Sequence, residues 1–325
     1  MLIHVSLVAF ALVRAVPPPT KGMYSLMSCD ILIHISADGT NTTIGRVDLG
    51  QHFNPVGTRL STIVEKTATM YVLALNKTDN VETALVRISL ADASITGVYP
   101  TPLLQASAEI GLGMTIDAYG KHGLVISGVD RATNKHTAYT VDIARGHAVQ
   151  KLSDGFLAGA EGMLDPAHCF DAQSSTFWLM SPGKNYSASG LFDLVGIDLS
   201  TGSEVARHTQ PAVWMVHAME HDPHTGGLVA LGLDATTFKP FVFTIEATTF
   251  KPTIVAEFDA YSIFNSISAW DPLRRTIFGM GYASHTDLDP VLLSYSLADK
   301  TKASRDLCQG GDIPPFNIDW FPGAL

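Results

Sequence analysis

The sequence predicts an all-β fold, a six-bladed β-propeller of four-stranded antiparallel blades, closed by a C-terminal strand that joins the N-terminal blade. The first observation behind this prediction is a series of short β-prone runs separated by Asp, Gly and Pro turns. Residues 214–258 contain four such runs, at 216–221, 228–233, 241–245 and 253–258. Residues 265–307 repeat this plan, with Asp271-Pro272 in the place of Asp222-Pro223.

The second observation is an internal period of about 50 residues. The third strand of the unit recurs at residues 31, 84, 139, 194, 241 and 292, and the second strand keeps the same spacing. Four-stranded units at this period are typical of propeller blades arranged around a central channel. The chain contains six such units, which predicts six blades.

The third observation concerns the two ends of the repeat. The first unit offers only three strands, at residues 23–29, 31–36 and 43–49. Residues 316–321 (FNIDWF) follow the sixth unit and resemble 264–270 (FNSISAW), an innermost strand. We therefore expect them to complete the first blade, which removes open sheet edges. No linker interrupts the repeat, so residues 23–325 are predicted to form one domain.

Composition excludes several classes of function. The 325 residues carry a net charge of −10, and their Lys and Arg do not cluster, which disfavours nucleic acid because phosphate binding requires positive charge. No apolar run reaches the roughly 18–20 residues that span a bilayer, so no transmembrane segment is predicted. A content of 46% hydrophobic and 16% charged residues indicates a folded chain, which we expect to be a monomer.

The first residues resemble a targeting segment. Residues 2–13 form a twelve-residue apolar stretch, and Val13 and Ala15 are small residues suited to a cut before Val16. Residues 1–15 are therefore predicted to be a signal peptide and 16–22 a linker. The alternative is a buried first strand, because the segment has no Lys or Arg before its apolar run. Three N-x-S/T triplets in predicted turns are candidate glycosylation sites, at Asn41, Asn76 and Asn185. Both signals favour secretion.

Three cysteines are too few for a disulfide scaffold in a chain of this size. Cys29 ends a strand of the closing blade and Cys308 ends the outer strand of its neighbour. A Cys29–Cys308 disulfide would tie this seam, provided that the Cα atoms lie within about 4.4–6.8 Å. The alternative for both is a small buried side chain, which is the expectation for Cys169.

One polar residue precedes each predicted innermost strand, again about every 50 residues. In propellers these segments lie at the mouth of the channel, so their side chains could converge. Two carboxylates and three amides would suit Ca²⁺, whereas an imidazole suits another divalent metal such as Zn²⁺. The alternative is that these residues only cap loops. The six candidate metal ligands are Asn54, Glu109, Glu161, His217, Asn265 and Asn317.

Residues 217–221 (HAMEH) formally match the H-x-x-E-H motif of a zinc peptidase class. That chemistry needs a helix, whereas the repeat places these residues on a strand followed by Asp222-Pro223. On a strand, His217, Met219 and His221 point one way and Glu220 the other. No nucleophile elbow, P-loop or dinucleotide motif is present, and catalytic residues remain unassigned.

The stretch Gly113-Met114-Thr115-Ile116-Asp117-Ala118, followed by Gly123-Leu124, is similar to a segment of the gluconolactonase (senescence-marker) propellers. The resemblance covers about a dozen residues of one blade. It implies a six-bladed propeller with a metal-dependent lactonase or phosphotriesterase activity. The metal-binding Asp of that family would fall at Leu112, so the pattern is incomplete and no catalytic residue is carried over.

These observations favour a secreted β-propeller that acts as a binding or interaction module for an extracellular ligand or protein. The alternative is a metal-dependent hydrolase with its ion at the mouth of the channel. A scaffold without a small-molecule site is the third possibility. The sequence does not identify the ligand and leaves open whether the protein is an enzyme.

Overall fold

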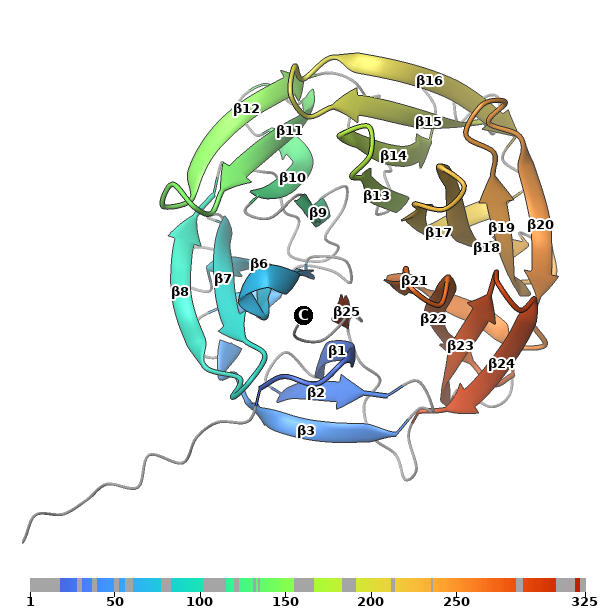
Figure 1. The fold of residues 1–325 in the computed structure, drawn as a ribbon, viewed down its shortest axis with the longest axis horizontal. Helices are drawn as coiled ribbons and strands as arrows, with labels where there is room; N and C mark the ends of the chain where they lie inside the picture. The colour runs from blue at the N-terminus through green and yellow to red at the C-terminus, as the bar shows by residue number, and fades with distance from the viewer. Residues whose placement is uncertain are drawn as a thin grey trace, which may run out of the picture.

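A computed structural model describes residues 18–27, 31–36, 40–49, 53–55, 61–76, 83–101, 115–119, 123–130, 133, 135–154, 167–182, 191–211, 214–234, 236–284, 289–307 and 319–321. In this part of the chain almost every residue belongs to a strand or a turn. Six antiparallel sheets form a ring around a central axis (Figure 1). The innermost strands surround the axis, and the outermost strands run along the circumference. The predicted six-bladed β-propeller is confirmed.

The first three blades follow the chain order, except that blade 1 also contains the last strand. Blade 1 comprises β25 (Asp319–Phe321), β1 (Gly22–Met27), β2 (Ile31–Ile35) and β3 (Asn41–Arg46). Blade 2 comprises β4 (Phe53–Pro55), β5 (Ser61–Val64), β6 (Thr69–Asn76), β7 (Thr83–Ser89) and β8 (Ile95–Pro100), with the 3-10 turn η1 (Glu65–Thr67). Blade 3 comprises β9 (Thr115–Tyr119), β10 (Gly123–Asp130), β11 (Lys135–Asp142) and β12 (Ala148–Asp154).

The other three blades are four-stranded meanders. Blade 4 comprises β13 (Ala167–Asp171), β14 (Thr176–Pro182), β15 (Leu191–Asp198) and β16 (Glu204–Pro211). Blade 5 comprises β17 (Trp214–Asp222), β18 (Gly227–Asp234), β19 (Pro240–Ile245) and β20 (Pro252–Glu257). Blade 6 comprises β21 (Tyr261–Asp271), β22 (Thr276–Tyr282), β23 (Pro290–Ser296) and β24 (Thr301–Asp306).

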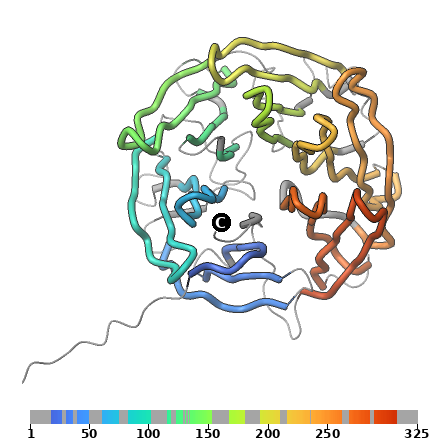
Figure 2. The backbone as a smooth tube through the Cα atoms, viewed as in Figure 1, coloured from blue at the N-terminus to red at the C-terminus, as the bar shows by residue number. Residues whose placement is uncertain are grey.

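The two ends of the chain meet in blade 1, as predicted. The pairs Gly22–Phe321, Met23–Trp320 and Tyr24–Asp319 join β1 to β25 in antiparallel register. The backbone in Figure 2 runs once round the ring, so the blue first blade lies beside the red sixth blade. Strand β1 begins at Gly22, the last residue of the predicted linker, because that residue already pairs with Phe321.

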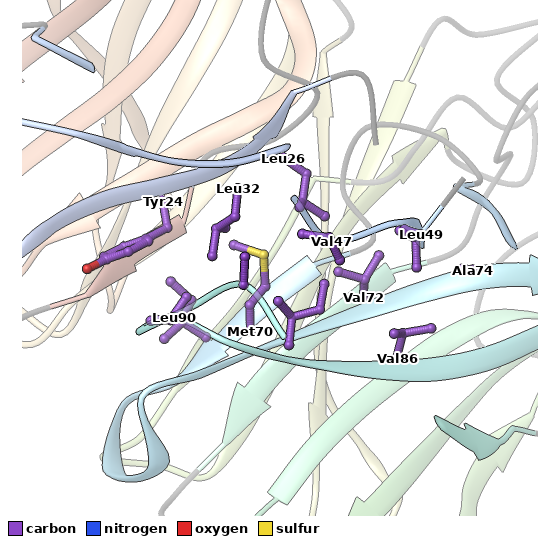
Figure 3. Packing of buried hydrophobic residues seen from close by; sticks show 13 residues of the cluster. Tyr24, Leu26, Leu32, Val47, Leu49, Met70, Val72, Ala74, Val86 and Leu90 are labelled. Atoms are coloured by element: carbon purple, nitrogen blue, oxygen red, sulfur yellow. The ribbon is translucent and has the colours of Figure 1, made fainter. Parts of the chain in front are cut away.

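The hydrophobic core is divided among the seams between neighbouring blades. Each of six buried clusters joins residues of two adjacent blades. In the cluster of Figure 3, Tyr24 and Leu32 of blade 1 pack on Met70 and Val72 of blade 2. Both faces of a blade are therefore buried, and every residue of β18 except the last is buried. A fully buried side chain of this kind contributes about 1.5–3 kcal/mol.

Turns at the rim also hold the seams. The turn between the third and fourth strands of a blade packs against the fourth strand of the preceding blade. His147 of blade 3 stacks on Tyr99 of blade 2, with ring centroids 3.3 Å apart, and Phe250 of blade 5 stacks on His208 of blade 4 at 3.6 Å. The corresponding turn residues all have a left-handed backbone, with φ between 53° and 72°: Ala93, His147, Gly202, Phe250 and Lys300.

Candidate functional site

The innermost strands of blades 5 and 6 lose their regular pairing at the same level. In β17, Val216 pairs with Gly232 and Ala218 with Leu231, so His217 is an extra residue in a β-bulge. In β21, residues 264–267 interrupt the ladder between the pairs Ile263–Gly281 and Ser268–Gly279. Bulges re-aim side chains and are common beside functional sites. The break leaves four or five regular pairs between it and the turn that ends each strand.

Blade 2 is interrupted at the corresponding place. Its innermost strand consists of two pieces, because Pro55 of β4 pairs with Ala74 and Ser61 of β5 pairs with Val72. Residues 56–60 between the two pieces lie outside the described residues. In blades 3 and 4 the described part of the innermost strand makes five pairs, and residues 102–114 and 155–166 before it lie outside the described residues. Regular pairing is thus interrupted at a corresponding level in blades 2, 5 and 6.

Three of the six predicted ligand positions lie in or beyond this break. Asn54 is in β4, His217 is the bulge residue of β17, and Asn265 is in the irregular part of β21. His217 is buried, with 9% of its surface exposed. The side chains of Asn54 and Asn265, and the whole of Glu109, Glu161 and Asn317, lie outside the described residues. Within the described set, no three His, Cys, Asp or Glu side chains are grouped to hold a metal ion. The ring of ligands therefore stays a prediction.

Residues 214–222 form a strand, which excludes the helical H-x-x-E-H arrangement. Side chains of this strand face the neighbouring blades. Met219 packs in the cluster with blade 4, and Nε2 of His221 lies 3.2 Å from Oδ1 of Asp171 in that blade. On the opposite side, Glu220 Oε1 accepts a hydrogen bond of 3.0 Å from Ser268 Oγ of blade 6. The alternation predicted for residues 219–221 is confirmed.

At the opposite end of blades 4, 5 and 6, the turn after the innermost strand begins with a buried Asp. Oδ1 of each carboxylate accepts the backbone N–H two residues later, at 2.8–3.2 Å, which closes the turn. The exposed fractions of Asp171, Asp222 and Asp271 are 8%, 1% and 0%. These carboxylates cap turns and serve structure.

Each of these carboxylates also meets a basic side chain of the following blade. Arg275 Nη2 lies 2.6 Å from Asp222 Oδ2, and Lys21 Nζ lies 3.7 Å from Asp271 Oδ2. Both bases stand directly before the second strand of their blade. Gly226 occupies this place in blade 5 and has no side chain to offer. There His221, rather than a permanently charged residue, faces the carboxylate of Asp171.

The ion pair shifts the titration of Asp222. Burial raises the pKa of this carboxyl, but hydrogen bonds from Arg275, Thr225 and the backbone of His224, with the charge of Arg275, outweigh it and hold the pKa below its usual value. Because the folded pKa is depressed, Asp222 stabilises the fold above the unfolded pKa of about 3.9. That stabilisation is lost as the pH falls through the folded pKa.

The pKa of His221 is also lowered, but this side chain becomes positively charged when it takes up a proton, whereas Asp222 becomes neutral. Burial lowers the pKa of His221, and the charges of Asp171 and Asp222 offset this only in part. The unfolded chain takes up the proton near pH 6.5 and the folded chain only at lower pH, so acid favours unfolding. We expect the free energy of unfolding to fall between pH 7.5 and 5.5, and a His221→Gln variant to show a smaller fall. Urea unfolding at both pH values measures this, and identical slopes would contradict it.

The modification candidates are only partly within the described residues. Cys169 is buried between blades 4 and 5, as expected, while Cys29 and Cys308 lie outside the described residues. Asn41 is exposed at the start of β3, and its Nδ2 donates a 3.1 Å hydrogen bond to the carbonyl of Leu307 across the closing seam. Asn76 ends β6 without a described side chain, and Asn185 lies outside.

A duplicated turn in blade 5 was missed by the sequence analysis. Residues 234–240 (DATTFKP) and 246–252 (EATTFKP) differ only in their first residue and lie at opposite ends of β19. Phe250 of the second turn packs in the seam with blade 4, whereas Phe238 of the first is 41% exposed. The repeated heptapeptide was the signal that could have revealed the pair.

The comparisons with known proteins support the fold alone. No protein-family profile matches the sequence, and no curated protein is significantly similar to it. TolB from Acinetobacter baumannii has a similar structure, with a TM-score of 0.58 and 10% identity over 95% of this chain and 69% of that chain. A chain of the nidogen/laminin complex gives 0.54 and 9% identity, with coverage of 91% and 96%. Puromycin hydrolase gives 0.50 and 12%, with coverage of 93% and 48%.

No helix among the described residues is long and apolar enough to cross a membrane.

Proposed function

We propose that this propeller is a secreted binding or interaction module whose ligand binds at the end of the ring where the innermost strands begin. The observation that carries the proposal is the corresponding level at which regular pairing is interrupted in blades 2, 5 and 6. Interrupted strands free backbone groups and re-aim side chains at one end of the axis. Secretion is supported by the apolar segment 2–13 and the triplets at Asn41, Asn76 and Asn185.

Ligand-induced stabilisation tests the proposed location, because a ligand that binds the folded state raises the melting temperature. The panel comprises oligosaccharides, lactones, short peptides and divalent chlorides. We expect at least one class to stabilise the protein, and His217→Ala to abolish that shift. His224→Ala, in the turn at the other end of β17, is the matched control and should retain it. If His224→Ala abolished the rise in melting temperature and His217→Ala did not, the ligand would bind at the opposite end of the ring and the proposed location would be contradicted.

A metal-dependent hydrolase is the second candidate. The placement of Asn54, His217 and Asn265 in or beyond the break of three blades supports it, because one donor per blade could approach a common ion. Glu109 and Glu161 would supply the carboxylates. Calorimetric titration with Ca²⁺ and Zn²⁺ should then show uptake that Glu109→Gln abolishes, together with turnover of a lactone or phosphotriester. Unchanged uptake in the variant would remove Glu109 from the ligand set.

A further inference from the structure

The two copies of the duplicated turn place their phenylalanines in the same backbone conformation. Phe238 and Phe250 have φ values of 55° and 53°, in the left-handed region that bulky residues rarely adopt. In both turns the Phe N–H donates to the carbonyl of the first turn residue, at 2.9 Å. The strand after each turn begins with Pro, at Pro240 and Pro252. The same turn therefore presents the same ring at both ends of β19.

The surroundings of the two rings differ. Phe250 is packed in the seam between blades 4 and 5. Its ring stacks on that of His208 with the planes 15° apart, and its ring centroid lies 5.5 Å from that of Trp178. Among the described residues, Phe238 has a ring contact with Tyr261, with centroids 6.1 Å apart and planes tilted by 48°. A ring presented as in the packed copy, yet 41% exposed, leaves a face available for a further ring.

The turn of Phe238 is held by hydrogen bonds to the carboxylate of Asp234. Oδ1 of Asp234 accepts the N–H groups of Thr236 and Thr237 at 2.9 and 2.7 Å and the Thr237 hydroxyl at 3.0 Å. These hydrogen bonds, first those from the backbone of Thr237 and Thr236, hold the pKa of Asp234 below its usual value. A ring held by such a turn loses little freedom when it binds, which favours affinity.

This turn lies at the end of the ring proposed above for the ligand. Asp234 pairs with Trp214, the first residue of the innermost strand of blade 5. Tyr261 is the first residue of the innermost strand of blade 6. Lys239 Nζ and Asp259 Oδ1, 3.7 Å apart and exposed to 56% and 91%, flank the two rings with polar groups.

We propose that Phe238 and Tyr261 form a stacking platform for a sugar ring, with Lys239, Asp259 and Thr236 bonding its hydroxyls. This deepens the proposed function and depends on its location. Phe238 is the one exposed large apolar side chain among the described residues of the turn between β18 and β19. Its area is far smaller than the roughly 800 Å² per partner of a protein interface. A pyranose offers both the apolar face and the hydroxyls that this set of groups can bind.

An oligosaccharide array tests the platform, with free glucans, mannans and chito-oligosaccharides in one arm and glycans on a carrier protein in the other. We expect the wild-type protein to bind at least one pyranoside in one or both of these arms. By calorimetry with that sugar, Phe238→Ala should weaken binding at least about fivefold, because ring stacking is worth about 1 kcal/mol. Phe238→Trp and Tyr261→Phe, which keep the rings, should bind nearly as wild type. Leu273→Ala, which removes the 75% exposed side chain of a turn at the other end of the ring, is the matched control.

Absence of binding on both arms, or sugar binding that Phe238→Ala leaves unchanged, would overturn the platform. The two proposals can fail separately. Sugar binding that depends on Phe238 but survives His217→Ala supports the platform and contradicts a site at the strand bulge. A His217-dependent thermal shift from a non-sugar ligand, without any sugar binding, contradicts the platform alone. If Phe238→Ala does not fold, Tyr261→Ala carries the same expectation.

Discussion

Replacing Gly202 by alanine is expected to destabilise the protein by about 3–5 kcal/mol. Gly202 has a φ of +72° in the turn between β15 and β16, and an added Cβ would lie 2.2 Å from the carbonyl oxygen of Leu152 in blade 3. That oxygen belongs to the backbone of β12, so the clash can be relieved only if the seam between blades 3 and 4 opens. The free energy of unfolding in urea measures the loss.

Gly146→Ala is the matched control for backbone strain. Gly146 has nearly the same φ, +70°, in the equivalent turn of blade 3, and an added Cβ meets nothing within 4 Å. This variant should lose only the cost of a left-handed alanine, about 1–2 kcal/mol. If Gly202→Ala and Gly146→Ala lost the same free energy of unfolding, the clash with the carbonyl oxygen of Leu152 would add nothing to the backbone strain, and the prediction would be wrong.

Arg275→Met is expected to cost about 3–5 kcal/mol, because it leaves the buried Asp222 without its counter-charge. The Arg275 side chain is 24% exposed and that of Asp222 2%, so solvent cannot replace the lost bond. The pKa of Asp222 should rise in the variant, since burial then acts with less opposition. Chemical unfolding from pH 7 to pH 3 should therefore show that the variant loses less stability in acid than the wild type.

Adding Asp222→Asn to Arg275→Met separates this effect from lost packing. Because the neutral amide has no charge to compensate, the double variant should recover part of the stability that the single variant loses. Asn can still accept the N–H of His224 and so preserve the turn. No recovery in the double variant would mean that the guanidinium stabilises the seam through packing rather than charge.

The blade repeat could be predicted because it depends on alternation and turn residues, which are local properties of the chain. The strands of blade 5 were placed within a few residues of their observed ends, and the pairing of the last strand with the first followed from counting strands. Cys169 was correctly expected to be buried. Strand positions and the burial of Cys169 could be predicted because both depend on which apolar side chains are buried.

The contacts between blades could not be predicted in the same way. Asp222 and Arg275 belong to different blades, and their pairing depends on how two wedges are placed side by side. The bulge at His217 inserts one residue without changing the hydrophobic pattern of β17. Left-handed turns at Phe238 and Phe250 lack the glycine that usually signals such a conformation. Only the duplicated heptapeptide pointed to them.

The pairing of β25 with β1 also sets the order in which the protein can be completed during synthesis. Gly22, Met23 and Tyr24 are translated before blades 2 to 6, whereas their partners in β25 are translated after blade 6. Met23 is fully buried in the finished ring against residues of blade 6, so it stays uncovered until that blade has been translated. We expect the nascent chain to hold an unfinished first sheet until β25 has been translated, and a chaperone that shields this sheet would act before that point.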